Sequence, residues 1–111
     1  MPSKTFLIQS VGLGRGDGQL GKMLMANFLR LLGESQNKPS RVVFMNAGVK
    51  LACEGSHALV HLKKLEEQGV EILACTTCLE FFELVDKLKV GKPTTMVKSI
   101  QSMMNSEIVC L

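Results

Sequence analysis

The stretch VEILACTTCLEFF, residues 70–82, changes its pattern near its centre. It opens with a short apolar run that includes β-branched residues, which is typical of a buried strand. Further along, the apolar residues recur at helical spacing: Phe81, Phe82, Val85 and Leu88. Gly91 and Pro93 predict where this helix ends. The sequence therefore predicts a strand over 70–74 that runs directly into Cys75 and is followed by a helix.

The same alternation of strand and helix extends along the whole chain. Further apolar runs predict strands at 5–11, 41–46 and 107–111, and a weaker signal predicts a short one at 93–96. Helical spacing predicts helices over 20–32 (ended by Gly33), 57–65 (capped by Ser56, ended by Gly69) and 96–104. Such alternation is typical of an α/β fold, here a three-layer sandwich around a mostly parallel sheet of four or five strands. The 111 residues suffice for a single domain over 1–111.

Composition limits the classes of partner. The net charge is only +3, the basic residues are scattered, and the aromatic residues are five Phe with no Tyr or Trp to stack on bases. These features argue against nucleic-acid binding. The apolar runs are too short to cross a membrane, and the N-terminus has no signal-peptide pattern, so a cytoplasmic location is expected.

A glycine-rich segment, GRGDGQLGK (14–22), imitates three known motifs. Its P-loop frame lacks the Ser or Thr that should follow Lys22, because the next residue is Met. Its dinucleotide-binding frame starts about five residues too late, and Asn46 stands where an acidic residue is needed. The Arg-Gly-Asp tripeptide has meaning only in a secreted protein. The segment is better explained as a strand-to-helix turn capped by Asp17, with Gly14 and Gly16 at the rim of a pocket.

The strongest chemical signal is the C-x-x-C formed by Cys75 and Cys78. Thr77 and Glu80 fit a capping box, which predicts Thr77 at the N-cap and Cys78 at the first helical position. The partial positive charge of a helix start favours the thiolate there. Cys75, at the carboxyl end of its strand, is expected to be open to incoming anions. Such thiols suit persulfide or disulfide chemistry.

The expected connectivity adds residues from elsewhere in the chain. His57 should begin the preceding helix at the level of Cys75, where a neutral imidazole is a possible base; His61, one turn further on, is less suited. Asn46 and Lys50, which follow the second strand, are expected at the rim of the same pocket. Thr76 and Thr77 complete the set of binding candidates.

Other interpretations remain open. The C-x-x-C is also compatible with a structural role, with a thioredoxin-like disulfide exchanger, or with a zinc site that includes His57 and His61. A core of this size needs no metal, so neither a metal nor a cofactor is expected. Cys53 and Cys110 are interpreted as small apolar residues, and the Met-rich last helix as core or subunit contact.

The segments FMNAGVKLACEGS, LEEQGVEILACTTCLEFFELVDKLKVGKPTTM and SEIVCL, together with the glycine-rich segment, resemble a known family. They are similar to the C-terminal domain of YedF-type proteins, the sulfurtransferase-like proteins of selenium metabolism within the DsrE-like group. The resemblance implies a DsrE-like fold, assembly as homotrimers or homohexamers, and a cysteine that carries sulfane sulfur as a persulfide. It aligns the carrier with Cys75 and leaves Cys78 as a second or resolving thiol.

The resemblance also implies sulfur donor and acceptor proteins as partners, including a TusA-like sulfur carrier. Two positions depart from the family pattern: Thr76 replaces a glycine, and Thr95 replaces an asparagine. A positive φ at residue 76 would strain a threonine.

The leading hypothesis is a sulfur-relay protein. The alternative is a non-catalytic assembly or small-anion-binding module with structural cysteines.

Overall fold

The computed structural model describes residues 3–111 and contains a five-stranded sheet. Its strands are β1 (Lys4–Ile8), β2 (Arg41–Phe44), β3 (Glu71–Cys75), β4 (Lys92–Thr94) and β5 (Glu107–Cys110). The helices are α1 (Gly18–Glu34), α2 (Leu59–Glu67), α3 (Thr76–Phe81) and α4 (Met96–Met104), with 3-10 helices η1 (Asn46–Ala52) and η2 (Val85–Lys87). The strand order is β4-β3-β2-β1-β5, and every neighbouring pair is parallel. The predicted α/β sandwich is confirmed, including the weakly signalled strand β4.

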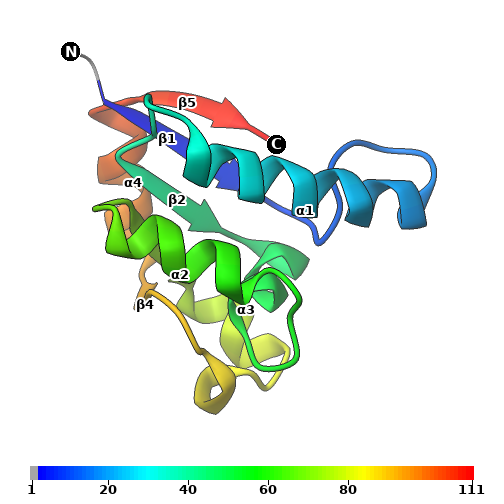
Figure 1. The fold of residues 1–111 in the computed structure, drawn as a ribbon. Coiled ribbons are helices and arrows are strands. Elements are labelled where there is room, and N and C mark those ends of the chain that lie inside the picture. The colour runs from blue at the N-terminus through cyan, green and yellow to red at the C-terminus, as the bar shows by residue number, and fades with distance from the viewer. Residues whose placement is uncertain (1–2) are drawn as a thin grey trace.

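Helices cover both faces of the sheet (Figure 1). Helices α1 and α2 lie side by side on one face, and α4 lies on the other. The core on the α1 and α2 face is formed by fully buried side chains such as Leu29 of α1, Leu62 of α2, and Phe44 and Ile72 of the strands. Burying each such side chain contributes about 2 kcal/mol, so this face supplies much of the stability.

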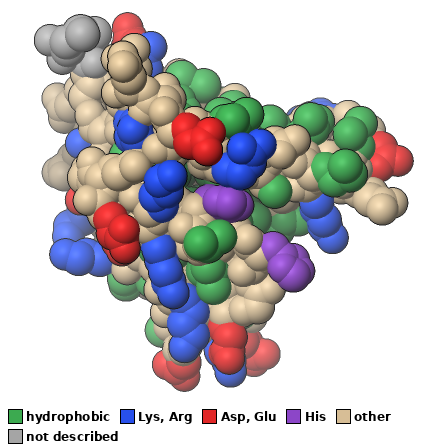
Figure 2. All heavy atoms as spheres, in the orientation of Figure 1, with side chains coloured by type: hydrophobic (Ala, Val, Ile, Leu, Met, Phe, Trp, Pro, Cys, Tyr) green, Lys and Arg blue, Asp and Glu red, His purple; other side chains and the backbone are tan. Residues whose placement is uncertain are grey.

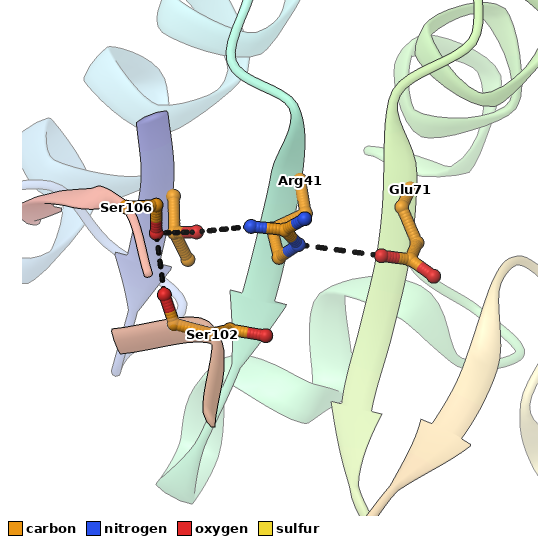
Figure 3. A network of polar contacts seen from close by, with 5 residues as sticks. Arg41, Glu71, Ser102 and Ser106 are labelled. Atoms are coloured by element: carbon orange, nitrogen blue, oxygen red, sulfur yellow. Dashed lines mark hydrogen bonds and ion pairs between the residues drawn. The ribbon is translucent and has the colours of Figure 1, made fainter. Parts of the chain in front are cut away.

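A polar network joins the sheet to the segment that follows α4 (Figure 3). Arg41 of β2 donates one hydrogen bond to Thr5 Oγ1 of β1 (3.0 Å) and another to Glu71 Oε1 of β3 (3.3 Å). Thr5 Oγ1 lies 2.7 Å from Ser106 Oγ, which donates to the carbonyl oxygen of Ser102 (2.6 Å). The network connects three strands to the end of α4, so the role of Arg41 is structural.

Helix α4 carries its polar side towards the sheet. Ser99 is buried, whereas Met96, Val97, Ile100 and Met104 are each at least half exposed. The helix was predicted correctly, but the interpretation of its methionines as core is wrong. A subunit contact at this surface remains a prediction.

Three other expectations on element bounds need correction. The helix predicted through Leu88 ends at Phe81, because Glu83 adopts a left-handed φ of 57° and the chain then forms η2. Strand β1 ends at Ile8 rather than at residue 11, and Gly33 lies inside α1.

Within residues 3–111, no helix has both the length and the apolar character that a bilayer crossing requires.

Candidate functional site at the end of strand β3

Two thiols meet at the carboxyl end of β3. Cys75 is the last residue of this strand and the N-cap of α3, and the residue is only 3% exposed. Cys78 lies on the first turn of α3 and is half-buried. Both are free thiols, and the Cys75 side chain lies close enough to interact with that of Cys78. The expectation that Cys75 is open to incoming anions is wrong, and Cys78 is the more accessible of the pair.

Asn46 supplies a hydrogen-bond donor to this pair. Its backbone N–H donates to Cys78 Sγ at an N···S distance of 3.1 Å. Asn46 follows β2 and begins η1 with a φ of 50°, a left-handed conformation that asparagine tolerates better than most residues. The sequence predicts Asn46 at the rim of the site but not its contact with Cys78, since the two residues are 32 positions apart.

The electrostatics of Cys78 differ from expectation. Burial raises the pKa of the Cys78 thiol, and the neighbouring Cys75 thiol raises it further, whereas the Asn46 N–H lowers it in part. The net effect is a pKa above the ordinary value of a cysteine. The prediction of a thiolate favoured at rest is therefore wrong for Cys78.

Cys78 does not lie at the start of its helix, because the helix begins earlier than expected. Helix α3 starts at Thr76, so Thr77 lies inside the helix, and no side chain caps its N-terminus. The predicted capping box of Thr77 and Glu80 does not form. Cys78 is consequently the third helical residue rather than the first, in a helix of only six residues with a weak dipole.

Thr76 links this turn to the edge strand. Its hydroxyl donates a hydrogen bond to the carbonyl oxygen of Thr94 at 2.9 Å. Among the described residues, positive φ outside glycine occurs only at Asn46 and Glu83, so threonine causes no strain at position 76. A threonine at this position is thus compatible with the turn, and Thr77 beside it is exposed.

His57 does not begin α2 as expected, whereas Lys50 lies near the Phe82 ring at the end of α3, so its place at the rim of the cysteine site remains a prediction. Helix α2 begins at Leu59 rather than near residue 57, and Ser56 accepts a hydrogen bond from the Ala58 N–H instead of capping the helix. Both His57 and Lys50 line a cavity of about 690 Å³ whose lining includes neither Cys75 nor Cys78. The role of His57 as a base next to Cys75 therefore finds no support in the geometry.

The glycine-rich loop is also separate from the thiols. Gly14 and Gly16 are exposed, with φ values of 82° and 120°. The loop projects beyond the N-terminal end of α1 (Figure 1). Asp17 caps α1 as predicted, because its Oδ1 accepts a hydrogen bond from the Leu20 N–H at 2.8 Å. The expected contribution of this loop to a site at the two cysteines remains a prediction.

Metal-binding groups do not gather at the C-x-x-C. Across residues 3–111, no three His, Cys, Asp or Glu side chains come together as metal ligands would. The alternative zinc site from His57, His61, Cys75 and Cys78 is therefore not formed. Of the other two cysteines, Cys53 is buried, as expected for a small apolar residue, whereas Cys110 is exposed.

The parallel sheet and its helices define a DsrE-like fold. The chain is similar to the YchN protein of E. coli, with a TM-score of 0.76, 17% identity and full coverage of both chains. It is also similar to a protein of unknown function from Methanobacterium thermoautotrophicum, with a TM-score of 0.70, 20% identity and full coverage of both chains. A third similar structure, from Bacteroides thetaiotaomicron, has a TM-score of 0.65 at 13% identity, over 98% of this chain and 95% of the other.

No protein-family model and no curated protein matches the chain. At these identities the structural likeness establishes the fold alone.

Proposed function

We propose that this protein carries sulfane sulfur as a persulfide on Cys78, with Cys75 as the adjacent thiol. The observation that carries the proposal is the position of Cys78, half-buried beside a second thiol and 3.1 Å from a backbone N–H donor. A fixed N–H donor stabilises negative charge on sulfur in a site that is partly shielded from water. The DsrE-like fold supports the same conclusion.

The transfer step is an exchange between thiol and persulfide. Cys78 sulfur attacks the outer sulfur of a donor persulfide, R–S–SH, and the donor's S–S bond breaks. The departing thiolate takes the proton that Cys78 gives up, which leaves R–SH and Cys78–S–SH. An acceptor thiol reverses the sequence by attacking the outer sulfur of Cys78–S–SH. No oxidant is required, because the sulfane sulfur only changes its carrier.

The choice of Cys78 over Cys75 follows from access. The outer sulfur of a donor must approach the attacking atom along the S–S axis, which requires an open path. Cys75 is 3% exposed, so a protein donor reaches Cys78 first. Cys75 is then placed to act on a persulfide formed next to it.

The partners proposed are sulfur donor and acceptor proteins of the cytoplasm, including a TusA-like sulfur carrier. The finer assignment to the YedF type, with its link to selenium metabolism, belongs to this proposal and rests on the sequence resemblance. Assembly as a homotrimer or homohexamer is proposed as well, supported by the exposed apolar side chains of α4.

Mass spectrometry tests the proposal directly. The protein is incubated with a persulfidated donor protein or with glutathione persulfide, and peptides are mapped. An increase of about 32 Da on the Cys78 peptide is expected, which Cys78→Ser abolishes and Cys110→Ser leaves intact. Persulfide found only on the exposed Cys110, or on no cysteine, contradicts the proposal.

A second candidate function is an assembly module in which the cysteines are structural. The burial of Cys75 and the raised pKa of Cys78 favour it, as does the apolar surface of α4. It predicts that replacing both C-x-x-C cysteines by alanine leaves every partner interaction unchanged. Persulfidation of Cys78 by a protein donor contradicts it.

A further inference from the structure

A cavity lies between α1, η1 and the loop before α2. Its volume is about 690 Å³, which falls within the range of cavities that hold small organic molecules. The molecular surface there is rich in hydrophobic side chains below α1, with histidine and basic side chains nearby (Figure 2).

The floor of this cavity is apolar and fixed. Met25 of α1, Leu51 of η1 and Ala58 are all buried members of the core that also line the cavity. The half-buried side chains of Val11, Ala26 and Ala47 continue the apolar wall. An apolar ligand body placed here is in contact with rigid side chains, so little ordering is needed on binding.

The rim carries uncompensated positive charge. Lys22 and Lys50 line the cavity and are exposed, and among residues 3–111 neither forms an ion pair. Glu54 also lines the cavity, but it pairs with Lys87 at 3.5 Å. His57 adds a further polar group at the rim.

Lys50 is oriented by contact with an aromatic ring. Its Nζ lies 4.5 Å from the centroid of the Phe82 ring, a cation–π arrangement. One ammonium group at the rim is thus oriented before any ligand arrives.

We infer that this cavity binds a small organic anion with an apolar body, such as a medium-chain carboxylate, whose head lies between Lys22 and Lys50. The apolar body contacts Met25, Leu51 and Ala58. The inference is independent of sulfur transfer, because the cavity lining includes neither cysteine of the C-x-x-C.

Nuclear magnetic resonance of the full chain tests the inference with octanoate as probe. Saturable amide shifts are expected at Ala26, Ala47 and Gly55, all of which line the cavity. Octanol, which has the same apolar body without the charge, should bind more weakly. Lys22→Met and Lys50→Met should each weaken octanoate binding roughly two- to fivefold, the range of an exposed charge interaction.

The matched control is Lys63→Met, an exposed lysine of α2 that does not line the cavity, and it should leave binding unchanged. Ala26→Phe, which fills the cavity, should abolish binding, and the two lysine variants decide the matter if that protein does not fold. Equal binding of octanol, shifts centred on α4, or no saturable shift at about 10 mM octanoate overturns the inference. None of these results depends on whether Cys78 accepts sulfur.

Discussion

Asn46 and Cys78, 32 positions apart in the chain, are joined by a hydrogen bond from the Asn46 N–H to Cys78 Sγ. The bond depends on the left-handed backbone at Asn46, where φ is 50°. Glycine adopts this conformation freely, whereas a β-branched residue is strained by about 1–2 kcal/mol. The contact therefore depends on backbone geometry more than on the amide side chain.

A pair of substitutions at position 46 separates these two contributions. Asn46→Gly should keep the N–H donor in place and leave the alkylation rate of Cys78 within about twofold of the wild type. Asn46→Val should displace the donor, raise the pKa of Cys78 further and slow its alkylation at neutral pH. Equal rates for the two variants would show that the N–H has no influence on the thiol.

The four thiols should react in the order of their exposure. Iodoacetamide at neutral pH is expected to label Cys110 first, Cys78 more slowly, and Cys53 and Cys75 last. Because the pKa of Cys78 is raised, its thiolate is scarce at neutral pH, and its rate should still increase above pH ~8.5. Peptide mapping across a pH series gives both results, and a Cys78 rate that levels off below pH 8 would contradict the raised pKa.

Gly48 of η1 should tolerate no side chain. A Cβ built at this position lies 2.3 Å from the carbonyl oxygen of Ile8, a backbone atom that cannot move aside. Gly48→Ala should lower the free energy of unfolding by at least about 2 kcal/mol. The control is Gly18→Ala at the start of α1, where a Cβ meets nothing within 4 Å, and it should be neutral or stabilising by up to ~1 kcal/mol. Urea denaturation of the two variants checks the difference.

Arg41 should contribute more to stability than its ion-pair partner. Its side chain is 24% exposed, and it donates to both Thr5 and Glu71, so Arg41→Met should cost about 1–2 kcal/mol. Glu71 is 57% exposed, so Glu71→Gln should cost less than about 0.5 kcal/mol. Thermal denaturation compares the two, and equal losses would show that the ion pair dominates.

The outward side of α4 should govern self-association. Ile100→Glu places a charge among exposed apolar side chains and should shift the assembly towards monomers in light scattering, without lowering the stability of the isolated fold. Lys98→Glu, on the exposed side of the same helix, is the control for charge alone. A monomeric wild type at all concentrations would rule out the proposed oligomer.

The sheet was predictable from sequence because parallel strands buried on both faces are apolar runs, as at 41–46 and 70–74. The helix through Leu88 was not, since the spacing of Phe81 and Val85 imitates a helical face although both side chains are exposed. Spacing also located α4, but it carries no information on whether the apolar side faces the sheet or the solvent.

At the site, the sequence identified the two cysteines and Asn46 but not their relationship. The capping box was misleading because Thr76 enters the helix directly from β3. Local sequence has no signal for the contact between Asn46 and Cys78, which arises only when β2 and β3 pair in register.

The close approach of η1 to the end of β1 limits the substitutions that this sequence can accept during evolution. Gly48 is required by backbone proximity whatever chemistry takes place nearby. A descendant that gave up both thiols for another task would still need this glycine to place Asn46 and the residues after it. The steric demand of the scaffold is thus independent of any reaction at the two thiols.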